Sequence, residues 1–338
     1  MRDVSRLAGV STMTVSRVLA DPDLVAEETR TRVLDAVAQL RYVPDRMAGS
    51  LSSRRSGFVA LILPTLMNSN FADTAQALTE GLRKAGYQLL IGVTLYRQDE
   101  EERVVQSVLT RRPEAIVLTG MAHARETTAM LIEAGVPVVE IWDVQDRPVD
   151  HVVGFSNVEV GRAAARHLAG LGHRRIGALG PAADGEARDV RGEERLAGFA
   201  GGLRECGLPD DLIQRHPRVP LSFTEGGEAM GRLLERAPDL DAVFAVSDLL
   251  AVGALMECQR RSVAVPEDLS LMGFGDFEIG RQTVPPLTTV RVDARAIGLR
   301  TAEVILDALG ADRPPAPVHD LGFEILSRGS TRPSRRTV

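Results

Sequence analysis

The sequence predicts an α/β protein in which an N-terminal helix-turn-helix bundle precedes a two-lobed core built on parallel sheets. Residues 1–51 have the pattern of short helices, broken at Gly9 and at Asp21-Pro22-Asp23. From Phe58 onward, apolar runs of four to six residues alternate with helical patterns, which is typical of buried parallel strands. The series is too long for one six-stranded sheet and shifts phase near residues 150–161, so we expect two lobes.

The N-terminal helices can be justified in order. A first helix over Asp3–Ala8 can end at Gly9 in a left-handed turn, and Ser11 can then cap a second helix over Thr12–Leu19. A third helix over Glu27–Leu40 has apolar residues at helical spacing. Pro44 prevents its continuation, and Asp45 can cap a short helix that reaches Leu51.

The core elements follow from the alternation. Strands are predicted at Phe58–Leu63, Gln88–Val93, Ala115–Leu118, Val136–Ile141, Arg175–Leu179, Ala242–Val246 and Leu269–Gly273, with a late pair near Thr288–Val292 and Leu321–Leu326. Helices are predicted at Phe71–Ala85, Arg162–Leu171, Arg195–Cys206, Asp248–Arg261 and Ala294–Leu309.

These elements predict a division into domains. The boundaries are residues 1–43 for the helix-turn-helix domain, 44–56 for a hinge helix and linker, 57–154 with 287–312 for one lobe of the core, 155–286 with 313–327 for the other lobe, and 328–338 for a disordered tail. The tail is predicted to be disordered because it is basic and lacks apolar periodicity.

Composition excludes several classes. The 338 residues are 44% hydrophobic and 25% charged, as in ordinary globular chains. No apolar run approaches the roughly 20 residues of a membrane span, and the start lacks the apolar region of a secretory signal, so we expect cytoplasmic residence without membrane contact. A solute-binding protein for a transporter would need such a signal and would lack the N-terminal helices.

An enzyme is the main rival class. The chain has no G-x-G-x-x-G after a strand, no phosphate-binding glycine loop with lysine and no Cys/His spacing typical of a metal site. Its six histidines are scattered along the chain. We therefore expect no catalytic residue, no metal and no cofactor.

Charge and helix geometry point to DNA at the N-terminus. Residues 1–57 hold nine arginines and seven acidic residues, whereas the whole chain has a net charge of −6. On the second helix Thr12 and Ser16 share a face with Met13 and Arg17, because each pair is four residues apart. Arg17 can bind guanine O6 and N7, and Met13 can contact a thymine methyl group. The alternative is a helical bundle without a DNA role.

The motifs of the whole chain resemble the lactose/galactose-repressor (LacI-type) family. The matching residues are Val4-x-x-Leu7-Ala8-Gly9-Val10-Ser11, Thr14-Val15-Ser16-Arg17-Val18-Leu19, Tyr42-x-Pro44, Leu171-Gly172-His173-Arg174, Asp248-Leu249-Leu250-Ala251-Val252-Gly253 and Pro285-Pro286-Leu287-Thr288. The resemblance implies a homodimeric, ligand-controlled transcription repressor that binds a pseudo-palindromic operator in double-stranded DNA. It also implies a core similar to periplasmic sugar-binding proteins.

The resemblance assigns the DNA contacts and a hinge. The implied DNA-binding residues are Ser11, Thr12, Met13, Thr14, Ser16, Arg17, Tyr42, Arg46 and Leu51. A helix over Asp45–Leu51 is too short to be stable alone, so it should fold only on DNA, where Leu51 would enter the minor groove. The alternative is an ordinary linker with Leu51 buried against the core.

The resemblance also implies a small-molecule effector between the lobes. The matching positions are Asn68, Phe71, Trp142, Asp143, Arg195, Phe223, Ser247, Asp248 and Asp276. Most follow strand C-termini, where open α/β sheets bind ligands. Carboxylates can accept hydrogen bonds from sugar hydroxyls, and Arg195 can bind a carboxylate. Alternatively, Asp248 caps a helix, Phe71 and Trp142 are core, and Arg195 pairs with Glu194 or Asp189.

The nature of the effector is suggested by particular segments. The segment Glu257-Cys258-Gln259-Arg260 is similar to that of the gluconate-operon repressors of the family. This similarity implies that the effector is gluconate or a related sugar acid and that its binding releases the repressor from DNA. Gly275-Asp276 stands where the family commonly has Asp-Asp, and Ser247-Asp248 where it commonly has Asn-Asp. Loss of a carboxylate suits an anionic ligand. An activator, or a response to another sugar or sugar phosphate, remains open.

Overall fold

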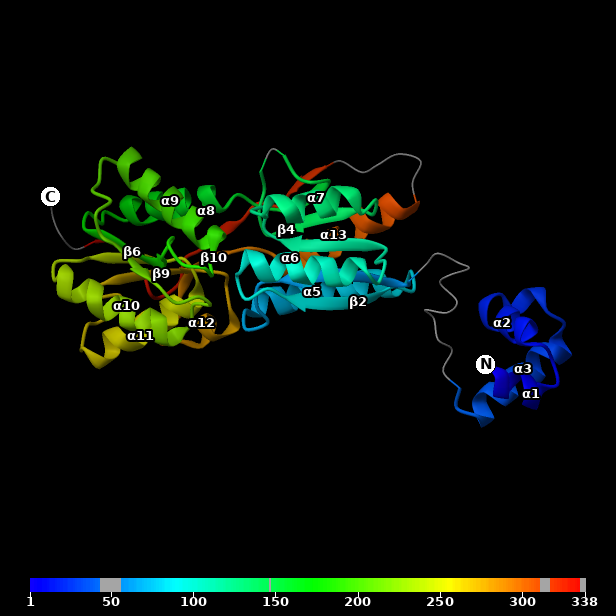
Figure 1. The fold of residues 1–338 in the computed structure, drawn as a ribbon. Helices are drawn as coiled ribbons and strands as arrows, with labels where there is room; N and C mark the ends of the chain where they lie inside the picture. Colours follow the sequence, from blue (N-terminus) through cyan, green and yellow to red (C-terminus); the bar gives the residue numbers. More distant parts are fainter. Residues whose placement is uncertain (43–55, 146, 311–316, 335–338) are drawn as a thin grey trace. The chain divides into compact units, whose positions relative to one another are not determined.

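The computed structural model describes residues 1–42, 56–145, 147–310 and 317–334. The chain forms two compact units, Met1–Ser56 and Gly57–Val338 (Figure 1). All of the predicted hinge and linker except Ser56 lies outside the described residues, and so do Arg46 and Leu51. The α/β class with an N-terminal helix-turn-helix is confirmed.

The N-terminal unit is a helical bundle around a small apolar core. Its helices are α1 (Arg2–Ala8), α2 (Thr12–Ala20), the 3-10 turn η1 (Pro22–Leu24) and α3 (Glu27–Gln39). Gly9 ends α1 with φ 64°, a left-handed conformation that glycine adopts readily. Val4, Val15 and Val33 are fully buried against one another, one from each α-helix. This core fixes α2 relative to the two other helices.

The first lobe is a parallel six-stranded sheet with helices on both faces. Its strands are β1 (Phe58–Leu63), β2 (Gln88–Val93), β3 (Ala115–Thr119), β4 (Val138–Ile141), β5 (His151–Gly154) and β11 (Val318–Asp320), in the spatial order β11-β5-β4-β3-β1-β2. Its helices are α5 (Ser69–Arg83), α6 (Gln98–Leu109), α7 (Arg125–Glu133) and α13 (Ala294–Gly310). The late helix α13 packs against α5.

The second lobe repeats this plan. Its strands are β6 (Ile176–Pro181), β7 (Ile213–His216), β8 (Ala242–Ala245), β9 (Ser270–Phe274), β10 (Thr288–Arg291) and β12 (Glu324–Leu326), in the order β12-β10-β9-β8-β6-β7. Its helices are α8 (Asn157–Gly170), α9 (Val190–Glu205), α10 (Phe223–Arg236), α11 (Asp248–Arg260) and α12 (Glu278–Gln282). Only β12 runs antiparallel to its neighbour among these strands.

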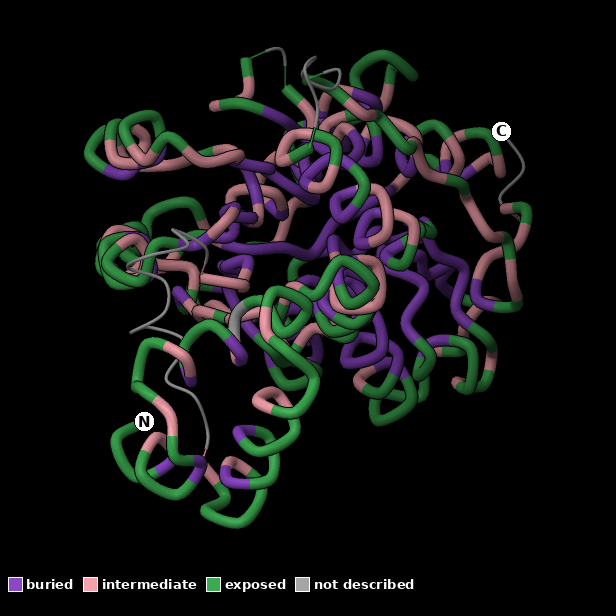
Figure 2. Tube along the Cα trace, turned by 90° about the vertical axis from the view of Figure 1, so that its right-hand side faces the viewer, coloured by how far each residue is buried: buried purple, intermediate pink, exposed green. Residues whose placement is uncertain are grey.

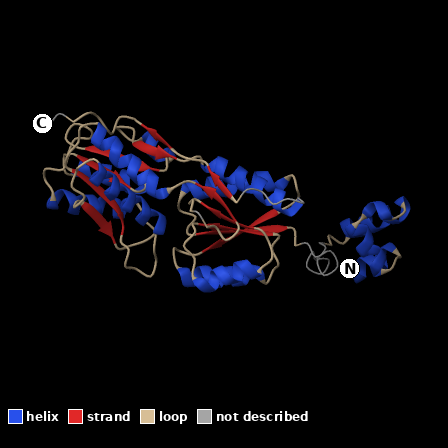
Figure 3. Ribbon diagram, turned by 90° about the horizontal axis from the view of Figure 1, so that it is seen from above, coloured by secondary structure: helices blue, strands red, loops and turns tan. Residues whose placement is uncertain are grey.

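Burial follows this layering. In the core unit the sheets lie between layers of helices (Figure 3), and the buried stretches of the trace concentrate inside the lobes (Figure 2). The strands β1, β6 and β9 are buried along nearly their whole length. Their continuous apolar runs therefore reflect coverage on both faces, as the sequence predicted.

The predicted lobe boundaries are wrong near the C-terminus. The strand predicted near Thr288–Val292 falls within residues 287–312 of the predicted first lobe, but the observed β10 pairs in parallel with β9 of the second. Val318–Asp320 pairs with β5 of the first lobe, although residues 313–327 were assigned to the second. The chain thus returns to the first lobe after β10 and crosses back between β11 and β12. The sequence pattern reveals strands but not which sheet edge each one joins.

The predicted disordered tail is wrong for residues 328–334. Ser330 is fully buried, its amide donates to Pro286 O at 3.0 Å, and its hydroxyl donates to Leu271 O at 2.6 Å. Arg328 forms an ion pair with Asp276. Backbone and hydroxyl hydrogen bonds hold this segment, and such bonds leave no apolar periodicity. Residues 335–338 lie outside the described part.

Close packing of α8 on α9 fixes the start of α9. A Cβ at Gly161 would collide with Arg195 O, and one at Gly198 would collide with Val158 O. Glycine at both positions lets the two backbones approach each other. The helix that carries Arg195 is therefore held tightly against its neighbour.

Candidate functional site

The exposed face of α2 is the first candidate site. Thr12, Met13, Ser16 and Arg17 are exposed, and 72% of the Met13 surface is accessible. Val15, on the opposite face, is fully buried. Because no acidic residue lies in α2, the face presents hydroxyls, a thioether and a guanidinium without a charge that would repel phosphate.

The other predicted DNA-binding residues that the structure describes also make contacts within this unit. Ser11 caps α2, since its Oγ accepts from Thr14 N at 3.0 Å, and the Thr14 hydroxyl lies 2.9 Å from the same Oγ. Tyr42 is half-buried and packs against the helical core. Thr14 and Tyr42 thus support the fold of the unit, and Ser11 orients the first turn of α2.

A cavity between the two lobes is the second candidate site. Five of the nine predicted effector residues line it: Asn68, Phe71 and Trp142 from the first lobe, and Arg195 and Ser247 from the second. Asn68 and Ser247 cap α5 and α11 through their side chains. Helix starts after strand ends thus bring these residues together, as expected for open α/β sheets.

Aromatic rings form one wall of this cavity. Phe71 and Trp142 meet edge to face with ring centroids 5.5 Å apart. The Trp142 indole nitrogen donates to Thr74 Oγ1 at 3.2 Å, and Trp142 adopts a left-handed backbone with φ 69°. These contacts hold the two rings in place, and the rings can pack on the C–H face of a polyol.

Arg195 is the buried cation of the cavity. Only 6% of its surface is accessible, and burial lowers its pKa from the ordinary value. Its Nε donates to Val246 O at 3.1 Å, and its Nη1 donates to Asn157 Oδ1. Its guanidinium carbon lies 4.2 Å from the centroid of the Phe274 ring, and its Nη2 lies 4.0 Å from Asp189. These contacts hold the guanidinium in one orientation.

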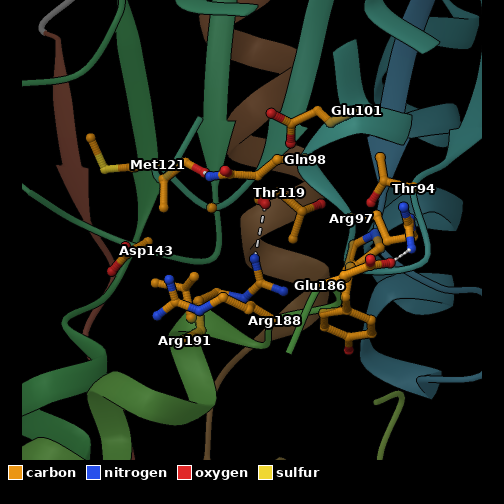
Figure 4. Close-up of a pocket in the computed structure, with 15 residues that line it drawn as sticks. Thr94, Arg97, Gln98, Glu101, Thr119, Met121, Asp143, Glu186, Arg188 and Arg191 are labelled. Carbon is orange, nitrogen blue, oxygen red and sulfur yellow. Dashed lines mark hydrogen bonds and ion pairs between the residues drawn. The ribbon is translucent and has the colours of Figure 1, made fainter. Parts of the chain in front are cut away.

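A neighbouring cavity at the same cleft contains Asp143 (Figure 4). Its lining includes Thr119 and Asp143 from the first lobe and Arg188 and Arg191 from the second. The Asp143 Oδ1 accepts from Val144 N at 3.0 Å and from Asn157 Nδ2 at 3.1 Å. Asp143 thus lies at the cleft but beside the first cavity, not in it.

Hydrogen bonds and an ion pair join the two lobes around these cavities. Arg188 N donates to Tyr96 O at 2.8 Å, and Arg97 pairs with Glu186. Deeper in the cleft, Asn70 Nδ2 donates to Gly275 O at 3.0 Å. A ligand in the cleft would therefore meet groups that already set the distance between the lobes.

Two predicted acidic residues do not reach either cavity. Asp248 is fully buried and accepts from Phe277 N at 2.8 Å and from Thr289 Oγ1 at 2.7 Å. Burial raises its pKa to about 7. Asp276 is ion-paired with Arg281 and Arg328. Both carboxylates stabilise the loop after β9, because their oxygens bond within the second lobe.

Phe223 does not line the cavity between the lobes, where the sequence predicted it. It begins α10, 40% of its surface is accessible, and it lines an outer groove with Met256. The preceding residues Pro220 and Leu221 line the inter-lobe cavity instead. A two-residue shift along a connecting loop decides which side chain faces the cleft, and the sequence pattern does not resolve such a shift.

Two residues of the cleft were not predicted from the sequence. Arg191 and Tyr96 line both cavities. Arg191 precedes Arg195 by one helical turn on α9, so the spacing could have revealed it. Tyr96 lies on a loop with no distinguishing pattern, and burial raises its pKa above the ordinary value.

Comparisons with known proteins agree with this geometry. Residues 1–45 match the model of bacterial regulatory proteins of the lacI family, and residues 165–331 match a periplasmic binding protein-like domain. The transcriptional regulator GntR of Pseudomonas aeruginosa is 37% identical over 98% of this chain and 95% of its own length. The chain belongs to the LacI family. The regulator IdnR of Escherichia coli is 33% identical over 96% of each chain.

Solved structures show the same fold for this LacI-family chain. A LacI-family regulator from Silicibacter pomeroyi has a TM-score of 0.90 at 35% identity and covers 98% of each chain. The regulator GntR from Chromobacterium violaceum has a TM-score of 0.76 at 35% identity over 81% of this chain and 99% of its own. The protein is a DNA-binding transcription repressor, and its relatives are regulators.

Two other findings bear on alternative functions. Within the part that the structure describes, no helix is long and apolar enough to cross a membrane. Within the same residues, no group of three or more His, Cys, Asp or Glu side chains could hold a metal ion.

Proposed function

We propose that this LacI-family chain acts as a homodimer that represses a catabolic operon and is released from DNA by a sugar acid of the gluconate type. The cavity between the lobes carries this proposal, because two arginines, aromatic rings and polar side chains from both lobes surround it. Such a site is suited to an anionic polyol, because the hydroxyls of that ligand need hydrogen-bond donors and acceptors and its carboxylate needs a cation.

The DNA contacts are proposed from the exposed face of α2. Arg17 can donate two hydrogen bonds to guanine, and Met13 can contact a thymine methyl group in the major groove. Thr12 and Ser16 can donate to phosphates or base edges. Arg46 and Leu51 are proposed to add contacts from the hinge.

The homodimer is proposed from exposed apolar side chains of the second lobe. Phe223 and Met256 line one groove between α10 and α11, and Ile279 lies on α12, which contacts α11. These three are 40–42% exposed. The groove with Phe223 and Met256 is therefore the surface that we propose as the interface between two copies. A second copy of the chain would place two α2 helices about 34–36 Å apart, one DNA turn.

Release requires the effector to favour one conformation of the core. A ligand held by both lobes stabilises the arrangement that closes on it, and the hinge would pass this change to the DNA-binding unit. To shift the equilibrium from 1:99 to 99:1, the ligand must bind the released form about 10⁴-fold more tightly than the DNA-bound form.

Calorimetry against a panel of sugars tests the effector class. We expect gluconate or its phosphate to bind the full chain with measurable heat, and neutral glucose to bind much more weakly, because the cleft offers arginine to a carboxylate. Binding of glucose but of no sugar acid would contradict the proposed class. Equal affinity for glucose and for the sugar acids would show that the charge of the ligand does not determine specificity.

A further inference from the structure

We infer that Arg191, rather than Arg195, binds the carboxylate of the effector and so determines the specificity for sugar acids. This inference rests on the proposed function and names the residue that selects the charge. Four arginines line the two cavities of the cleft: Arg97, Arg188, Arg191 and Arg195. They differ in how far their guanidinium groups are already occupied.

Two of the four are paired with carboxylates of the protein. Arg97 donates to both oxygens of Asp99, at 3.0 and 2.9 Å, and pairs with Glu186. Arg188 donates from Nε and Nη2 to the two oxygens of Glu193. In such a bidentate pair the N–H donors of the guanidinium are already used, so an incoming anion would have to displace the protein carboxylate.

Arg195 is fixed by its own lobe. Its Nε and Nη1 donate to Val246 O and Asn157 Oδ1, its Nη2 faces Asp189 at 4.0 Å, and the ring of Phe274 covers one face. The edge of the Arg195 guanidinium that could form a bidentate pair with a ligand carboxylate therefore already faces Asp189. Arg195 is better suited to orienting α9 and to a single bond with a ligand hydroxyl.

Arg191 is the least occupied guanidinium. Within the described part of the chain, its one hydrogen bond runs from Nη1 to Thr119 O at 2.9 Å, and no carboxylate there forms an ion pair with it. Arginine has five N–H donors, so the others can accept an anion. Its guanidinium carbon also lies 5.5 Å from the centroid of the Phe71 ring, which keeps the group at the cleft.

The position of Arg191 joins the two cavities. Arg191 lines both of them and belongs to the second lobe. It contacts two residues of the first lobe, Thr119 (Figure 4) and Phe71. A carboxylate bound by Arg191 can thus leave its polyol chain against Phe71 and Trp142. The carboxylate would then bind to a residue that itself contacts the other lobe, so binding of the ligand could affect how the two lobes pack.

The test compares gluconate with its neutral amide, gluconamide, by calorimetry on the full-length chain. In Arg191→Ala we expect gluconate to bind at least about 10-fold more weakly, as for a lost charged hydrogen bond. We expect gluconamide to bind the variant and the wild type within about twofold. Arg191→Lys should recover part of the gluconate affinity, because the charge remains without the planar fork.

Arg204→Ala is the matched control, since Arg204 lies in the last turn of the same helix, lines neither cavity and is paired with Asp210. It should change gluconate affinity less than about twofold. Arg191→Ala with unchanged gluconate affinity, or with gluconamide weakened as much as gluconate, overturns the inference and leaves the proposed function standing. If the wild type binds no sugar acid, the proposed function and the inference are both wrong.

Discussion

Arg17→Ala is expected to weaken binding to the cognate operator by about 1–3 kcal/mol and to remove the preference for one base pair in each half-site. Arg17 is exposed on α2, whose opposite face is anchored by Val15 and Val18. Its guanidinium is thus presented by a rigid helix. The measurement is selection of sites from random-sequence duplexes by each protein, followed by titration of the site that the wild type selects.

Arg6→Ala is the control for Arg17. Arg6 carries the same charge but lies on α1, where it is exposed and pairs with Asp3 at 3.4 Å. We expect it to weaken all sequences slightly and equally, because it lies outside α2 and its charge would act on DNA without reading the bases. An Arg17→Ala protein that selects the same sites as the wild type would refute base contact by this residue.

Arg195→Ala is expected to abolish the response to effector and to destabilise the core. The change leaves buried Asn157 Oδ1 and Val246 O without this donor, and Asp189 without its nearest cation, which together should cost about 3 kcal/mol of folding stability. We expect gluconate and gluconamide to lose affinity alike, since Arg195 orients the site. Calorimetry and thermal unfolding measure the two effects.

Arg204→Ala is the matched control on the same helix. Arg204 lies in the last turn of α9, is exposed and pairs with Asp210. Its loss should leave effector affinity and unfolding temperature nearly unchanged, as for other surface ion pairs. Full effector affinity in Arg195→Ala would contradict the assignment of this residue to the cleft.

Local patterns predicted the elements well, because helix caps and apolar periodicity act within a few residues. The Gly9 turn, the Ser11 cap and strands such as Phe58–Leu63 appear as expected. The sheet to which the last strands belong could not be predicted, since it depends on α13 packing against α5, more than 200 residues earlier in the chain.

The candidate site was only partly predictable for a similar reason. Residues at strand ends and helix caps, such as Asn68 and Ser247, reach the cleft because local structure puts them there. Asp248 and Asp276 have the right position along the chain, but their carboxylates find partners in Thr289 and Arg328. Competition for a buried carboxylate depends on side chains that are far away in sequence.

A titration of gluconate into the full-length protein bound to the operator that it selects tests most directly whether the core controls DNA binding. We expect operator occupancy to fall as gluconate saturates the core, and we expect the Arg195→Ala protein to stay bound throughout. Occupancy that remains constant while calorimetry shows the same protein saturated with gluconate would contradict the coupling between the inter-lobe site and DNA binding.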